Sequence, residues 1–216
     1  MSSDCPKVNI LRWRYLMSAR LFENDVIFLQ RLLGCCGLYK AEIDGIYGDK
    51  TNDAERAFDV RSTEIAEIEG VFDPRTEQNI RSLRTDAQVL ARRSIANLRA
   101  RGIDARVISG TRSYAEQNTL FRQGRFGNPG PIVTRARGGQ SWHNFGLAWD
   151  IGIFESGRYL TDDQPYRSAS SIGKIDGLEW GGDWRGFPDF PHYQLASAGM
   201  SIGSAREHFE CGGRIL

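Results

Sequence analysis

The chain has 216 residues, enough for one or two domains, and its 40% hydrophobic and 25% charged residues exclude a disordered or low-complexity protein. Its 28 basic and 27 acidic residues leave a net charge of +1, which gives no reason to expect nucleic-acid binding. No run approaches the about 20 apolar residues of a membrane helix, and residues 1–20 lack the apolar core of a signal peptide. The sequence therefore predicts a globular protein that is synthesised in the cytoplasm and does not insert into a membrane.

Residues 1–84 have the pattern of a small helical module with a lead-in arm over residues 1–23. Asn24 or Asp25 is expected to cap a first helix, whose apolar side chains recur at helical spacing. A glycine-rich turn follows, and Thr51 is expected to cap a second helix.

The segment VIFLQRLLGCCGLYKAEIDGIYGDKTNDAERAF, residues 26–58, resembles the peptidoglycan-binding domain appended to many cell-wall hydrolases. The features that carry the resemblance are Leu-Gln, a helix ended by glycine, Asp-Gly-x-x-Gly, and then threonine with a further helix. The resemblance implies that the module holds the protein on the cell wall. The alternative is a helical docking module without a ligand.

Residues 85–216 are predicted to form the second domain. Thr85 and Gln88 have the spacing of a capping box, which would give this domain its own first helix. A short strand is expected over residues 106–108, and a second capping box at Ser113 and Glu116 would open another helix. Strand, glycine and aromatic patterns then dominate, so this part is expected to be an α+β domain with a mostly antiparallel sheet.

The four cysteines give no sign of a metal site or a disulfide framework. Cys35 and Cys36 are adjacent, whereas Cys5 and Cys211 stand alone near the two ends. No Cys-x-x-Cys occurs, so the cysteines are expected to be reduced and without a role in the chemistry.

The first segment whose side chains could bind a metal or take part in catalysis contains His143 and Asp150. After Gly146 the residues alternate as in a half-buried strand, with Asp150 on the face of small residues, where a carboxylate must be paired or bound to a cation. His143 is an odd number of residues away, so a straight strand would direct it to the other face. A turn or bulge at Gly146 can bring the two side chains together.

The second segment contains Asp189 and His192 on either side of Pro191, which interrupts a regular strand and lets the two side chains converge. Two imidazoles and the carboxylate of Asp150 would make three ligands and leave a fourth position for water, as a catalytic zinc site requires. Asp189 could then serve as the general base. From spacing alone, a simple hydrogen-bonded pair of histidine and aspartate is the alternative.

Four blocks in order resemble one family of zinc peptidases, the D-alanyl-D-alanine carboxypeptidases and L-alanyl-D-glutamate endopeptidases, which includes many bacteriophage endolysins. The blocks are Ser109-Gly110-Thr111-Arg112-Ser113-Tyr114-Ala115-Glu116-Gln117, Ser141-x-His143-x-x-Gly146-x-Ala148-x-Asp150, Glu179-Trp180-Gly181-Gly182-Asp183-Trp184 and Asp189-x-x-His192-Tyr193.

The resemblance implies one Zn²⁺ per chain, with its ligands, a catalytic acid/base and a substrate-binding arginine at matching positions. The ligands would be His143, Asp150 and His192; Asp189 would be the acid/base, and Arg112 would hold substrate and stabilise the oxyanion. Gln117, Trp180 and Trp184 are further candidates for the substrate site, although a structural aromatic corner is the alternative for the tryptophans. His208 matches no block and is expected at the surface.

Together these features imply a monomeric peptidoglycan hydrolase that cuts the L-alanyl-D-glutamate bond of the stem peptide in the periplasm or cell wall. D-alanyl-D-alanine carboxypeptidase activity is the alternative with the same chemistry, and a non-catalytic wall-binding protein is the alternative from another class. Without a signal peptide, release would need a holin or a secretion system, and phage lysis is the favoured setting.

Overall fold

The computed structural model describes residues 22–213 and 215, so nearly all of the predicted arm over residues 1–23, with Cys5, lies outside it. The described helices are α2 (Glu23–Cys35), α3 (Asp49–Glu69), α4 (Pro74–Arg81), α5 (Thr85–Ala100), α6 (Tyr114–Arg122), α7 (Asp163–Gly173) and α8 (Ile202–Glu210), with short 3-10 helices η1 (Trp142–Phe145) and η2 (Gly181–Asp183). The strands are β1 (Asp104–Ser109), β2 (Ala148–Glu155), β3 (Arg158–Tyr159), β4 (Leu178–Trp180) and β5 (His192–Leu195). None of the helices in this part of the chain is long and apolar enough to cross a bilayer.

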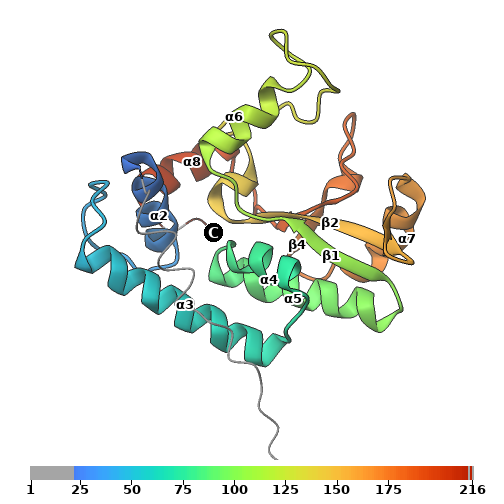
Figure 1. The fold of residues 1–216 in the computed structure, drawn as a ribbon, viewed down its shortest axis with the longest axis horizontal. Helices are drawn as coiled ribbons and strands as arrows, with labels where there is room; N and C mark the ends of the chain where they lie inside the picture. Colours follow the sequence, from blue (N-terminus) through green and yellow to red (C-terminus); the bar gives the residue numbers. More distant parts are fainter. Residues whose placement is uncertain (1–21, 214, 216) are drawn as a thin grey trace, which may run out of the picture.

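The strands form one antiparallel sheet in the order β1-β2-β5-β4, with β3 paired to β2. Alternation along β2 directs Trp149, Ile151 and Ile153 into the hydrophobic core, which α5 shares beneath the sheet (Figure 1). The predicted α+β architecture with a mostly antiparallel sheet is therefore confirmed. The capping box at Ser113 and Glu116 is present as expected.

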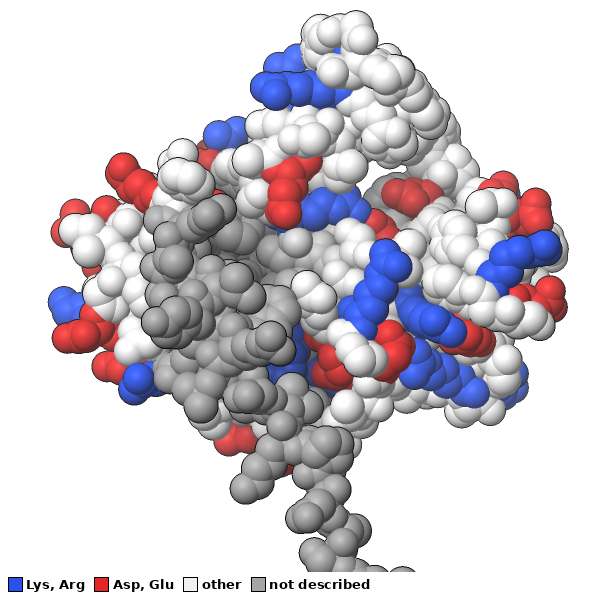
Figure 2. Space-filling model, in the orientation of Figure 1, with Lys and Arg blue, Asp and Glu red and all other residues white. Residues whose placement is uncertain are grey.

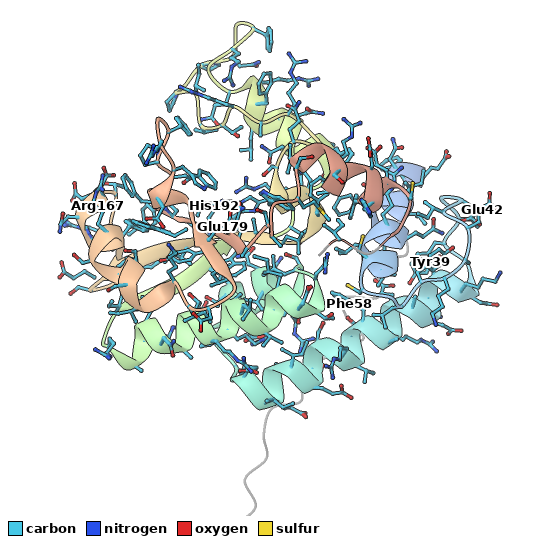
Figure 3. The ribbon with its side chains drawn as sticks, turned by 180° about the vertical axis from the view of Figure 1, so that it is seen from behind. Tyr39, Glu42, Phe58, Arg167, Glu179 and His192 are labelled. Atoms are coloured by element: carbon cyan, nitrogen blue, oxygen red, sulfur yellow. The ribbon has the colours of Figure 1, made fainter. Side chains whose placement is uncertain are left out.

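Helices α2 and α3 enclose a small core of their own, formed by Leu33, Tyr39, Ala54 and Phe58; Figure 3 labels Tyr39 and Phe58. Buried Gln30 explains the Leu-Gln and Asp-Gly elements of the N-terminal motif. Its side-chain oxygen accepts hydrogen bonds from the backbone N–H groups of Asp44 and Gly45, at 3.1 and 3.0 Å, which pins the turn against α2.

Two of the predicted helix caps in this region are wrong. Helix α2 begins at Glu23 after an uncapped Phe22, so neither Asn24 nor Asp25 is the cap. Helix α3 begins at Asp49, and the buried Thr51 hydroxyl instead contacts Gln30 and the carbonyl oxygen of Ile46. At Thr51, tertiary hydrogen bonds take the place of the predicted cap.

A third predicted cap is also wrong. Helix α5 begins at Thr85 as expected, but its N-cap is Arg84 without a side-chain hydrogen bond. The Gln88 side chain instead donates to Ser62 Oγ and to the carbonyl oxygen of Leu83, both at 3.0 Å. This glutamine therefore ties α5 to the N-terminal helices instead of capping its own helix.

The segment just before residue 84 is packed against the sheet. Ile80 and Leu83 are fully buried in the same core as β1 and β2. Asn79 Nδ2 donates to the carbonyl oxygen of Val107 at 2.8 Å, and the N–H of Val107 donates to Thr76 Oγ1 at 3.2 Å. Helix α4 thus covers the open edge of β1, an edge that would otherwise expose unpaired backbone groups.

We expect a fragment of residues 85–216 to be much less stable than the full chain, because it loses these edge contacts and two buried aliphatic side chains worth about 2–5 kcal/mol each. A fragment of residues 70–216, which keeps α4, is the matched control and should unfold at a higher temperature. Thermal unfolding followed by circular dichroism would measure both. If the 85–216 fragment unfolds as the full chain does, residue 84 is a true boundary between independently folding units.

Candidate metal centre and its surroundings

Three predicted ligands converge at one end of the sheet. Asp150 on β2 is paired in register with His192 on β5, so adjacent strands present the two side chains next to each other. His143 lies in η1, which ends at Gly146 with φ +70°, a backbone conformation that favours glycine. His143 Nε2 lies 3.2 Å from Asp150 Oδ1 and 3.2 Å from His192 Nδ1, and His192 Nδ1 lies 3.3 Å from Asp150 Oδ1.

Each histidine ring has an outer nitrogen, which faces away from the cluster, and an inner nitrogen, which faces it. The hydrogen bond of the outer nitrogen determines whether the inner nitrogen carries a proton. His143 Nδ1 lies 2.7 Å from the carbonyl oxygen of Gly110, and His192 Nε2 lies 2.9 Å from Gln194 Oε1. Because both partners are acceptors, both outer nitrogens must carry the proton. The inner nitrogens of two neutral rings then face each other with lone pairs, an arrangement that requires a proton or a cation between them. These donor atoms could therefore hold a metal ion.

The electrostatics of Asp150 and His143 agree with ligation. Burial opposes charge on Asp150, but the attraction and hydrogen bonds of His143 and His192, with Arg112, hold its pKa well below the usual range. Burial lowers the pKa of His143. For His192 burial acts in the same direction, but bonding to Asp150 outweighs it and raises the pKa. An anionic carboxylate and a neutral imidazole are the protonation states that metal ligands need.

Asp189 lies beside the cluster without belonging to it. Its backbone is held in a tight turn: its N–H donates to the Gly181 carbonyl at 3.0 Å, and its carbonyl accepts from the N–H of His192 at 3.2 Å. Gly181 is required there, since a Cβ would come within 2.5 Å of the Asp189 carbonyl oxygen. Burial, and then the negative charge of Asp150, raise the pKa of Asp189. No described residue donates a hydrogen bond to its carboxylate, so the group is free to exchange a proton.

Arg112 is fixed over the cluster by several partners. Nη2 donates to Asp150 Oδ2 and, at 2.9 Å, to Ser109 Oγ, while Nε donates to the same hydroxyl at 3.0 Å. Nη1 lies 3.4 Å from Gln117 Oε1. These contacts use four of the five N–H donors of a guanidinium and leave one on Nη1. Gln117 itself is fully buried, so it supports Arg112 instead of lining open space.

The two tryptophans of the third block differ in position. Trp180 is 6% exposed and belongs to the hydrophobic core, with its Nε1 donating to the carbonyl oxygen of Phe190 at 2.8 Å. Its position therefore contradicts a direct substrate contact and agrees with the structural alternative. Trp184 is 37% exposed, and its ring centroid lies 4.9 Å from that of His192. Trp184 thus flanks the cluster at the surface.

The third histidine lies at the surface, as predicted, and three of the four cysteines lie among the described residues. His208 is exposed on α8 and lies outside the ligand cluster, where Nδ1 contacts the carbonyl oxygen of Ser204. Cys35, Cys36 and Cys211 are free, and Cys35 is buried.

Two residues behind His192 were not singled out as functional by the sequence analysis. Gln194 receives the His192 proton on Oε1 and donates from Nε2 to Glu179 Oε2 at 2.9 Å. The other oxygen of Glu179 accepts from the backbone N–H and hydroxyl of Ser197, at 2.9 and 3.1 Å. Figure 3 labels His192 and Glu179 at this side of the sheet. A buried glutamine two residues after a ligand on the same strand face was the available signal.

We expect Gln194→Met to weaken metal binding by about 10–100-fold, because the orientation and tautomer of His192 would no longer be held. Gln164→Met, at an exposed position of α7, is the matched control and should bind metal as the natural protein does. Competition with a chromophoric chelator would measure both affinities. Equal affinities in the two variants would mean that Gln194 does not orient the ligand.

Comparison with known proteins shows which proteins this part of the chain resembles. Residues 134–195, which include His143, Asp150, Asp189 and His192, match the profile of a family described as D-alanyl-D-alanine carboxypeptidase. The resemblance to the D-alanyl-D-alanine carboxypeptidase and L-alanyl-D-glutamate endopeptidase family is thereby confirmed for this part of the chain.

Two relatives can be named more particularly. Over 105 residues the chain is 40% identical to the peptidoglycan L-alanyl-D-glutamate endopeptidase CwlK of Bacillus subtilis (strain 168), with 44% of this chain and 62% of the relative covered. The chain thus spans less than two thirds of that relative. The solved L-Ala D-Glu endopeptidase ChiX of Serratia marcescens is 28% identical and matches 59% of this chain and 90% of its own, with a TM-score of 0.41.

Proposed function

We propose that this protein is a zinc peptidase of peptidoglycan that cleaves the L-alanyl-D-glutamate bond of the stem peptide. The observation that carries the proposal is the convergence of His143, Asp150 and His192 on one point, with Asp189 and Arg112 beside them. The activity for which CwlK is named supports the choice of bond.

Zinc fits the geometry of the three donor atoms. Ligands about 2.0 Å from a tetrahedral zinc ion lie about 3.3 Å from one another. The separations between the donor atoms here are 3.2, 3.2 and 3.3 Å. Two nitrogens and one oxygen are also the donors expected of a catalytic zinc site, in which one position stays open.

When bound, zinc would acidify a water molecule and polarise the peptide carbonyl. Asp189 accepts the proton from the attacking water and returns it to the leaving amine, and its raised pKa suits a group that must hold the proton between the two steps. The remaining N–H of Arg112 Nη1 donates to the carbonyl oxygen as negative charge develops on it. Because Ser109, Gln117 and Asp150 hold the guanidinium, little reorganisation is needed at that moment.

D-alanyl-D-alanine carboxypeptidase activity is the second candidate, supported by the description of the matched family. Digestion of purified peptidoglycan, with mass spectrometry of the new termini, distinguishes the two. New amino termini on D-glutamate support the endopeptidase, and release of free D-alanine supports the carboxypeptidase. A protein that holds no stoichiometric zinc and releases neither product would be a non-catalytic wall-binding protein.

We further propose that residues 1–84 hold the enzyme on the wall and that residues 85–216 carry the catalysis. A cavity of about 480 Å³ supports the first part, since it opens between α2, α3 and the start of α5 and is lined in part by Arg56 and Arg61. A lytic role like that of phage endolysins is supported by the order of the two parts. Sedimentation of the full chain with intact sacculi, compared with an Arg56→Gln/Arg61→Gln variant, tests the attachment.

A further inference from the structure

The segment between α6 and η1 is unusual in its charge. From residue 117 to residue 149 the sequence contains no aspartate or glutamate, but it contains Arg122, Arg125, Arg135 and Arg137. None of these four arginines forms an ion pair with an acidic residue in the part of the chain that the structure describes. Residues 122–137, which we call the arginine lobe, therefore present uncompensated positive charge.

The arginine lobe is anchored to the catalytic side of the molecule. Buried Gln117 donates from Nε2 to the carbonyl oxygen of Ala136 at 3.0 Å and to Thr134 Oγ1 at 3.3 Å. The same glutamine contacts Arg112 through Oε1. One side chain thus connects the base of the lobe to the arginine that is paired with Asp150.

The arginine lobe also reaches the opposite rim of the site. The guanidinium of Arg135 lies 4.6 Å from the ring centroid of Phe187, which comes two residues before Asp189. Trp184, on the same rim, packs against His192. In Figure 2 the lobe overhangs a hollow, with basic atoms on the lobe and acidic atoms visible inside the hollow. Arg135 therefore lies against the segment that carries Asp189.

Two further arginines of the lobe lie against one ring. The guanidinium carbons of Arg125 and Arg137 lie 4.3 and 4.9 Å from the ring centroid of Phe121. Arg125 holds the lobe together, because its Nη1 donates to the carbonyl oxygens of Phe121 and Thr134 at 2.6 and 3.0 Å. Arg137 and Arg135 are both exposed. Like charges on one aromatic ring repel each other, and an anion between or beside them would relieve the repulsion.

We infer that Arg135 and Arg137 bind the free α-carboxylate of the stem peptide's D-glutamyl residue, next to the bond that is cut. This inference rests on the proposed function. The α-carboxylate is free because D-glutamate in the stem peptide continues the chain through its γ-carboxylate. Arg112 is already paired with Asp150, whereas neither Arg135 nor Arg137 forms an ion pair with an acidic residue that the structure describes. Planar guanidinium groups are well suited to carboxylates. Arg135 and Arg137 are thus specificity-determining residues that act on binding and leave the bond-making step unaffected.

The test uses the full chain and two peptides, L-alanyl-γ-D-glutamyl-L-lysine and the same peptide with its α-carboxylate amidated. Binding is measured by calorimetry in the Asp189→Asn background, where the peptide is not consumed. Amidation should raise Kd about tenfold, the loss expected for a charge-assisted hydrogen bond. Arg135→Gln/Arg137→Gln should raise Kd for the free peptide by a similar factor and leave Kd for the amide unchanged, which makes the two losses non-additive.

Arg158→Gln is the matched control, since it removes an exposed charge on β3, far along β2 from Asp150, and should change neither affinity. The inference is overturned if amidation leaves Kd unchanged, or if the double variant weakens both peptides equally. Turnover of the free peptide by the natural enzyme is measured separately. Failure to cut a peptide that binds with the expected preference would overturn the proposed function and leave the carboxylate site standing.

Discussion

Replacing Asp189 by asparagine is expected to remove most of the turnover and to leave the metal bound. The amide has nearly the shape of the carboxylate, and Asp189 lies outside the group of three donor atoms, so the metal affinity should not change. An amide cannot accept the proton of the attacking water, and loss of a general acid/base lowers kcat by about 10²–10⁴. The loss can be larger because one group is proposed to serve both proton transfers.

Asp150→Asn is the matched comparison, because it makes the same chemical change in the neighbouring carboxylate. It replaces an anionic donor by a neutral amide and also removes the partner of Arg112. Metal affinity should fall first, with part of the activity returning in excess zinc. Zinc per protein and turnover across a zinc titration would be measured for both variants. A zinc-depleted Asp189→Asn that excess zinc rescues, beside a metal-loaded but inactive Asp150→Asn, would mean that the two roles are reversed.

Replacing either histidine ligand by alanine is expected to remove metal and activity together. His143 and His192 each supply one of three donor atoms, and two remaining ligands hold a metal ion poorly. The hydrogen-bond partners of the rings cannot replace the lost ring nitrogen as a metal ligand. The carbonyl oxygen of Gly110 and the amide of Gln194 contact the side of each ring that faces away from the cluster. Elemental analysis and hydrolysis of stem peptide would show both losses.

His208→Ala is the control for these two variants, since this histidine is exposed on α8 and lies outside the cluster. It should keep both zinc and activity. Thermal unfolding of all three variants separates metal loss from misfolding. A folded His208→Ala protein that lacks zinc, or a His143→Ala protein that binds zinc with natural affinity, would contradict the assignment of ligands.

Local patterns in the sequence were sufficient to predict the core face of β2 and the turn that precedes it. Alternation after Gly146 predicts the core face of β2, and it places Asp150 on the opposite face because side chains alternate along any strand. The glycine at 146 indicates that the chain can turn between His143 and Asp150, since φ there must be free to become positive. These features depend on neighbours within a few residues, which is why they could be predicted.

Other features depend on contacts between distant parts of the chain, and only the tertiary structure determined them. Gln88 has the spacing of a capping residue but bonds to Ser62 in another helix. Trp180 belongs to the third of the four blocks that resemble the family, yet its ring is buried in the hydrophobic core. Neither outcome follows from local spacing. Both side chains contact residues that are distant in sequence and that come close only when the chain packs.

The sequence by itself therefore determined the set of chemical groups, two imidazoles and two carboxylates with an arginine, and their order along the chain. Only the tertiary structure decided which ring nitrogen of each histidine faces the centre, because Gly110 and Gln194 select it from the outside. It likewise decided that the arginine lobe meets Phe187 across the site, a contact between segments about 50 residues apart that no local pattern encodes.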